Sequence, residues 1–261
     1  MTTELIIILI FCYVDGVMMD IQKHPQAKLY PSELVTIGIL RALKGGGSRA
    51  FHRWLKWDYD ALFGGLPERT HLERALKAHE AWCDRFLAEP GLLLVMDSYP
   101  IELLFPIREG RSEQQVGTKG RDKGRWTIGL RLCWQLDTSG RVVDWAWAPL
   151  NVPDKTFNGL AACLSEQSLV FTDLGFRDAN GVPDNLVLCP KGTYNDRMMV
   201  ETAFSLLTVV CHLKKIGQRL ETYIEARLAY VAAMFNTLLA LFHQLHPKES
   251  PFKMSIAEFS L

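Results

Sequence analysis

The sequence predicts an α/β protein, with a mixed sheet covered by helices on both sides and preceded by an all-helical region. Two observations carry this prediction. Residues 1–89 have apolar side chains at helical spacing and end at the break Glu89-Pro90-Gly91. From residue 91 onward, short apolar or alternating runs typical of strands alternate with helix-like segments. We therefore expect a helical N-terminal region over residues 1–90 and a sheet-containing domain over residues 91–261.

Turn residues divide the N-terminal region into four predicted helices. The apolar run 5–14 predicts a buried helix ending near Asp15-Gly16. A signal or membrane segment is the alternative, but no basic residue precedes this run and it is shorter than the ~20 residues of a membrane span. Pro31-Ser32-Glu33 predicts the start of the second helix, with Ser32 as its N-cap. The triple glycine 45–47 ends it, and further helices are predicted over residues 48–57 and from Pro67 to about Ala88.

The second part of the chain alternates between strands and helices. Strands are predicted over residues 92–97, 125–137, 141–150, 168–173 and 185–190, and helices over residues 155–166, 194–213 and 220–245. Thr138-Ser139-Gly140 suits a hairpin between the second and third strands. Two of the strands end in an acid, Asp97 and Asp173. Because chemistry in open α/β sheets lies at strand ends, both carboxylates could reach one crevice.

A third candidate acid lies on the apolar segment NDRMMVETAFSLL, residues 195–207. At about 100° per residue, this acid belongs to a single polar stripe on the predicted helix, which is expected to face a wet cleft. The stripe consists of Arg197, Glu201, Ser205, Thr208 and His212. If that cleft also holds Asp97 and Asp173, the three carboxylates would repel one another unless a cation neutralised them. Such oxygen-rich sites suit Mg²⁺ or Mn²⁺, and two such ions can clamp the attacking and leaving oxygens of a phosphodiester.

Each acid also has a purely structural interpretation. An aspartate after a strand is often a loop or N-cap residue, and Glu201 could be the i, i+4 partner of Arg197. The combination of the three acids is more specific than any one of them.

The motifs around these acids resemble those of the DDE transposases of bacterial insertion sequences. The resemblance rests on MDSYPIEL (96–103), FTDLGF (171–176) and Tyr194-x-x-Arg197-x-x-x-Glu201, and residues 124–149 are similar to the second and third strands of that family. It implies a ribonuclease-H-like catalytic domain in which Asp97, Asp173 and Glu201 hold two Mg²⁺ or Mn²⁺ ions. Arg197 would orient Glu201 or contact the scissile phosphate, and Tyr194 would contact the flanking strand. The family often has a lysine seven residues after the glutamate, where this chain has Thr208.

The resemblance also implies an activity and partners. The protein is expected to cleave double-stranded DNA at the ends of an insertion sequence and to join the freed 3′-hydroxyl to target DNA. It would act as a homodimer on DNA in the bacterial cytoplasm, at the nucleoid, without a membrane partner. Two alternatives remain: a nuclease of the same fold that does not transfer strands, and a DNA-binding protein that has lost catalysis.

Basic side chains are concentrated locally, although 29 basic and 29 acidic residues balance over the chain. The cluster lies in a glycine-rich stretch that is predicted to be flexible, and such clusters grip backbone phosphates. The candidate DNA-binding residues are Arg108, Arg111, Lys119, Arg121, Lys123, Arg125, Lys191, Lys214 and Lys215, with Arg131 and Arg219 close by. A solvated loop is the alternative. The basic and aromatic residues 41–59 also permit a helix-turn-helix that reads DNA.

The six cysteines, Cys12, Cys83, Cys133, Cys163, Cys189 and Cys211, are scattered, without a CxxC pair or a histidine cluster. This pattern predicts reduced, buried cysteines in a cytosolic protein, and neither a disulfide framework nor a zinc site.

Overall fold

A computed structural model describes residues 1–103, 116–122, 124–190, 197–218 and 220–261. The chain is α/β and divides into two compact units. The helical unit comprises Met1–Phe86, Val210–His212 and Thr222–Leu261, and the sheet unit comprises Leu87–Val209 and Leu213–Glu221. Residues 222–261 thus group with the N-terminal helices, whereas the sequence prediction assigned them to the sheet domain.

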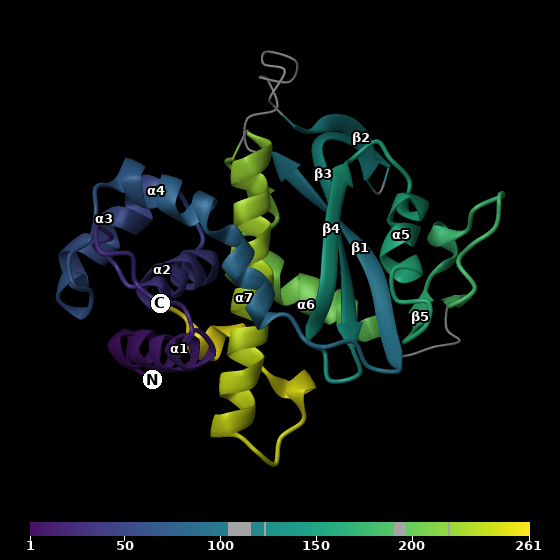
Figure 1. Cartoon of the computed structure of the whole chain (residues 1–261). Helices are drawn as coiled ribbons and strands as arrows, with labels where there is room; N and C mark the ends of the chain where they lie inside the picture. Colours follow the sequence, from purple (N-terminus) through teal and green to yellow (C-terminus); the bar gives the residue numbers. More distant parts are fainter. Residues whose placement is uncertain (104–115, 123, 191–196, 219) are drawn as a thin grey trace. The chain divides into compact units, whose positions relative to one another are not determined.

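Five α-helices build the helical unit (Figure 1). They are α1 (Thr3–Val17), α2 (Pro31–Lys44), α3 (Ser48–Asp58), α4 (Arg69–Ala78) and α7 (Glu221–Leu245), with short 3-10 helices η1 (Asp60–Leu62), η2 (Glu80–Phe86), η6 (Pro251–Lys253) and η7 (Ile256–Phe259). The predicted helix ending near Ala88 is therefore wrong in its second half, because α4 stops at Ala78 and a 3-10 segment follows.

Helix α2 begins at Pro31, and its N-cap lies two residues before the predicted one. Tyr30, and not Ser32, is its N-cap, with Pro31 in the first helical position. Proline suits that position because its missing N–H would have no partner there. The Glu33 carboxylate reaches back and accepts a hydrogen bond from the Tyr30 N–H at 2.6 Å.

The predicted N-terminal helix is present as α1, with one buried face that includes Ile6 and Ile10, while Leu5 and Ile8 are 44% and 42% exposed. Within the described residues, α7 is the one helix that is long and apolar enough to span a membrane, and 78% of its most apolar stretch is buried inside the protein.

Helices α2 and α7 approach each other closely at Gly38, where an added Cβ would overlap the ring of Tyr230. Tyr230 is 4% exposed and its hydroxyl donates to the Leu76 carbonyl at 3.3 Å, so the ring cannot easily move aside. We expect Gly38→Ala to lower the free energy of unfolding by about 1–3 kcal/mol through overpacking. Urea denaturation would measure this. Gly16→Ala is the control, since nothing lies within 4 Å of its added Cβ, and it should leave stability unchanged or raise it.

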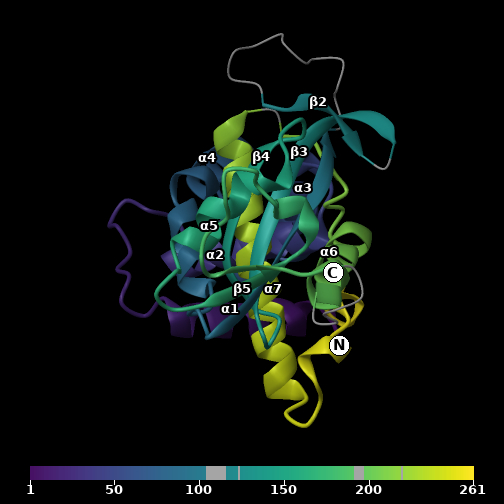
Figure 2. The ribbon, with the colours of Figure 1, turned by 90° about the vertical axis from the view of Figure 1, so that its right-hand side faces the viewer.

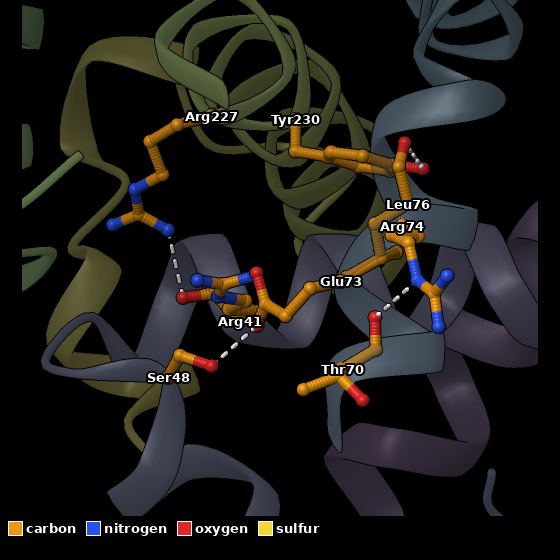
Figure 3. Close-up of polar contacts among 8 residues, drawn as sticks. All are labelled: Arg41, Ser48, Thr70, Glu73, Arg74, Leu76, Arg227 and Tyr230. Atoms are coloured by element: carbon orange, nitrogen blue, oxygen red, sulfur yellow. Dashed lines mark hydrogen bonds and ion pairs between the residues drawn. The ribbon is translucent and has the colours of Figure 1, made fainter. Parts of the chain in front are cut away.

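The guanidinium of Arg227 forms a second group of polar contacts in the helical unit. It donates hydrogen bonds to the carbonyls of Arg41 at 2.8 Å (Figure 3), Ala42 at 3.4 Å and Cys211 at 3.2 Å. Two of these are carbonyls of the last turn of α2, which have few partners within the helix. Burial, with a smaller contribution from Arg41, lowers the pKa of Arg227 to about 10, so it remains charged at pH 7. The neighbouring Arg41 pairs with Glu73, which also accepts from the Ser48 hydroxyl at 2.6 Å.

Replacing Arg227 with Met should remove the donor from the Ala42 and Cys211 carbonyls, while the Arg41 carbonyl keeps its bond from the Gly45 N–H at 3.1 Å, and we expect a loss of about 2–4 kcal/mol in unfolding free energy. Arg227→Lys should recover only part of it, because an ammonium cannot reproduce the planar fork. Arg74→Met is the matched control, since exposed Arg74 also donates to a helix carbonyl, that of Thr70 at 3.3 Å (Figure 3). Equal losses for Arg227→Met and Arg74→Met in urea denaturation would contradict a special role for Arg227.

The sheet unit contains one seven-stranded mixed sheet (Figures 1 and 2). Its strands are β1 (Leu93–Leu103), β2 (Thr118–Asp122), β3 (Arg125–Asp137), β4 (Val142–Pro149), β5 (Leu169–Thr172), β6 (Leu186–Leu188) and β7 (Lys215–Ile216). Strand β1 pairs antiparallel with β3 and parallel with β5 and β7. Strand β3 also pairs antiparallel with β2 and β4, and β6 is parallel to β5.

The predicted β3–β4 hairpin is confirmed, whereas β2 and β7 were not predicted. Residues 118–122, which form β2, are largely charged or glycine and lack the apolar alternation by which strands are recognised in a sequence. They form a strand because β3 supplies a hydrogen-bonding partner. The predicted helix over residues 155–166 is shorter in the structure, where η4 (Asp154–Phe157) leads into α5 (Asn158–Ala162).

Helices cover both faces of the sheet (Figure 1). On one face, Met96 and Cys133 pack in a core with Phe157 and Ala161 of the η4–α5 segment. On the other, Phe204 of α6 (Arg197–Val210) stacks on Tyr99 at 5.3 Å between ring centres and also contacts Trp134. Because side chains alternate along a strand, Asp97 lies on the same face as Tyr99.

Candidate active site

Asp97 lies within a strand and not at its end, contrary to the prediction. Strand β1 continues to Leu103 because β3 pairs with it as far as Glu102, and Asp97 is directly opposite Trp134. The second acid is as predicted, since β5 ends at Thr172 and Asp173 follows it. Both aspartates are half-buried.

The pairing of β1 with β5 sets the level of the two aspartates. Val95 pairs with Phe171, and the Thr172 hydroxyl donates to the Met96 carbonyl at 2.9 Å. Asp97 and Asp173 are the next residues along the two segments. Asp97 continues within β1, whereas Asp173 follows the end of β5, so both lie near the carboxyl edge of β5.

Backbone N–H groups orient each carboxylate. Asp97 Oδ1 accepts from the Ser98 N–H at 2.7 Å, and Asp173 Oδ1 accepts from the Gly175 N–H at 2.7 Å. Asp173 is also the N-cap of η5 (Leu174–Phe176), so its structural interpretation is correct as well.

A further acid, Asp154 at the start of η4, joins this edge, and sequence reasoning missed it. Its Oδ1 accepts hydrogen bonds from the Ser98 hydroxyl and from Arg131 Nη1, the latter at 2.7 Å. Ser98 therefore links Asp97, through its N–H, to Asp154, through its hydroxyl. The signal available in the sequence was the position of Asp154 ahead of a predicted helix, after strand β4.

Gly175 allows Asp154 and Asp173 to approach each other. A Cβ added at Gly175 would lie 2.8 Å from Asp173 Oδ1 and 2.9 Å from Asp154 Oδ2. Both oxygens therefore border the same small space, which only a glycine leaves open. Arg131 Nη1 and the Ser98 hydroxyl offset part of the resulting negative charge.

Glu201 lies on α6, one turn before Phe204, the residue that packs on the face carrying Asp97. It is exposed, as is Ser205, so this part of the polar stripe faces solvent. His212 lies beyond the end of the helix, with φ of 53°, and is not part of the stripe.

Several predicted site residues lie outside the described residues: Arg108, Arg111, Lys123, Lys191, Tyr194 and Arg219. Arg197 is the first residue of α6, but its side chain is not described. The roles of Tyr194 and Arg197 therefore remain predictions.

The described basic residues fall into two groups. Lys119, Arg121 and Arg125 are exposed on the β2–β3 hairpin, where part of the stretch predicted to be flexible is a strand, and Lys214 and Lys215 are exposed next to β1. Arg131, by contrast, is tied to Asp154 and has a side chain that is only 18% exposed. We therefore remove Arg131 from the candidate phosphate contacts.

In the possible helix-turn-helix, two of the basic residues have internal partners. Arg41 pairs with Glu73, and the Lys44 ammonium donates to the Leu261 carbonyl at 3.0 Å. Arg53 lies over the ring of Trp57, which is 75% exposed.

In the part of the chain that the structure describes, no three His, Cys, Asp or Glu side chains are grouped so that they could hold a metal ion. All six cysteines are free, but Cys12 and Cys163 are exposed, so the prediction of burial is wrong for these two. Burial raises the pKa of the Cys133 thiol well above its usual value, with Asp97 and Asp154 adding to the shift, so this cysteine stays protonated.

No protein family model matches the chain, and no curated protein matches it either.

Proposed function

We propose that the sheet unit catalyses metal-dependent cleavage and strand transfer of DNA, as DDE transposases do. The observation that supports this best is the parallel pairing of β1 with β5, in which Asp97 and Asp173 are the residues that follow the last contact between the two strands. The face that carries Asp97 is the one on which α6, with Glu201, is packed.

The strand connections agree with a ribonuclease-H-like core. Strands β1, β3 and β4 are paired antiparallel in chain order, and β5 and β6 run parallel to β1 on its other side. In this interpretation β2 and β7 are short additions. The acids follow the order that the resemblance implies: one on the first core strand, one after the fourth, and a glutamate on a later helix.

The candidate ligands are all carboxylates, and carboxylate oxygens are the type of ligand that Mg²⁺ and Mn²⁺ prefer. Asp97, Asp173 and Glu201 are proposed as the ligands, although the described side chains do not gather into a three-ligand group. Bound divalent ions would supply charge neutralisation and an activated water. The Ser98 and Gly175 N–H groups would keep the carboxylates of Asp97 and Asp173 oriented.

The exposed cations at the β2–β3 hairpin would contact the DNA backbone. Lys119, Arg121 and Arg125 belong to this surface, and Lys214 and Lys215 extend it next to β1. A homodimer on DNA remains part of the proposal, because both ends of an element must be held together.

A supercoiled plasmid tests the proposal without knowledge of the terminal repeats. The protein with Mn²⁺ should nick the plasmid and join a labelled duplex with a free 3′-hydroxyl to it, and EDTA should prevent both. Nicking without joining would favour the nuclease alternative. DNA binding with neither reaction would favour the inactive DNA-binding protein.

A further inference from the structure

A pocket of about 330 Å³ lies at the end of β1 beyond Asp97. Its walls come from four strands and include Leu103 of β1, Lys119 of β2, Trp126 and Ile128 of β3, and Lys215 of β7. This is the end of the sheet where β2 lies beside β3 (Figures 1 and 2).

The aromatic wall of the pocket is exposed to solvent. Trp126 is 62% exposed, an unusual state for the largest apolar side chain, and it lies directly opposite Arg121 in the β2–β3 pairing. The Lys119 ammonium lies 5.4 Å from the centre of its ring. An open aromatic face with a cation beside it is the arrangement on which unpaired bases stack.

Among the described residues, the charged side chains that line the pocket are Glu102, Lys119 and Lys215. Glu102 is paired with Lys215 at 3.0 Å and with Arg125. Burial alone would raise the pKa of Glu102, but the two cations outweigh it and lower the pKa, so the group is ionised at pH 7. Lys119 and Lys215 are thus the two described cations that face a ligand in this pocket.

We propose that this pocket binds one unpaired nucleotide of a DNA strand, with its base stacked on Trp126 and its phosphates held by Lys119 and Lys215. The proposal rests on the function proposed above and names the form of the substrate. A paired base has both faces covered by its neighbours, so only an unpaired one can lie against Trp126. The ionised Glu102 can accept a hydrogen bond from an amino group of the base.

A few nucleotides of one DNA strand could span the distance between this pocket and the candidate active site. Glu102 is five residues beyond Asp97 along β1. At about 3.3 Å per residue this is roughly 17 Å, or about five base steps of a duplex. The pocket would therefore hold a nucleotide close to the position of cleavage.

Binding without catalysis tests this inference. Fluorescence anisotropy with a labelled 12-nucleotide single strand in EDTA would compare the parent with Trp126→Ala. We expect a Kd that is about 5- to 100-fold higher for Trp126→Ala, from the loss of one stacked base. Trp126→Phe should keep most of the affinity, and the Kd for a duplex of the same sequence should change less than twofold.

Phe252→Ala is the control, because Phe252 is another exposed aromatic side chain, at 54%, and lies far along the chain from both candidate DNA-binding segments. It should leave single-strand binding unchanged. An unchanged Kd for Trp126→Ala, or equal losses for both variants, would overturn the pocket as a base site. If the parent nevertheless cleaves DNA, the proposed function survives; if the parent binds no DNA of either form, both proposals fall.

Discussion

Replacing Asp173 with Asn is expected to abolish metal-dependent nicking and strand transfer while the protein remains folded. Asn is as good an N-cap as Asp, so the bond from the Gly175 N–H and the start of η5 should be kept. What is lost is the charge of the carboxylate. Replacing a residue that only supports a metal ligand typically lowers activity by about 10- to 100-fold. Replacing a direct ligand should therefore lower activity by more than about 100-fold. Plasmid nicking with Mn²⁺ would measure the activity, and thermal denaturation in EDTA the stability.

Asp178→Asn is the control for this change. Asp178 lies five residues further along the same loop, accepts from the Asn180 N–H at 3.1 Å and pairs with Lys155 at 3.2 Å. Its substitution should leave nicking within about twofold of the parent, since the group is a surface partner only. Full activity of Asp173→Asn would remove Asp173 from the catalytic group and leave its N-cap role.

Much of the sheet could be predicted because its strands are apolar runs that end at turn residues. The segments 125–137 and 141–150 carry the alternation of a half-buried hairpin, and the structure has β3 and β4 there. The end of β1 was missed for a physical reason. Asp97 looks like the end of an apolar run, yet β1 continues because β3 offers paired backbone groups along residues 129–137. Partners distant in sequence leave no local signal.

The same reasoning explains what was found and missed in the candidate site. The two strands near which Asp97 and Asp173 lie could be predicted, because both are apolar runs that end at or near an acid. The position of Asp154 could not be predicted, since its approach to Asp173 depends on the loop after β4 and on the missing side chain of Gly175.

Glu201→Gln should reduce metal-dependent cleavage by at least about 100-fold, while the melting temperature of the metal-free protein stays unchanged. The first expectation follows from its proposed role as the third carboxylate of the metal site. The second follows from its exposure, since exposed substitutions usually alter stability by less than about 0.5 kcal/mol. Added Mg²⁺ should then raise the melting temperature of the parent more than that of the variant, because a ligand stabilises only the state that binds it.

Glu166→Gln is the matched control for Glu201→Gln, because it makes the same chemical change at another exposed position of the sheet unit. It should keep both cleavage and the response to Mg²⁺. If Glu201→Gln behaves like Glu166→Gln, Glu201 is a solvated residue of α6, and the third ligand must come from elsewhere. Asp154 is then the next residue to test, since its Oδ2 already borders the same space as Asp173 Oδ1. If Glu201→Gln instead unfolds the protein while cleavage persists in the folded fraction, its role is structural, and the pairing with Arg197 becomes the explanation to pursue.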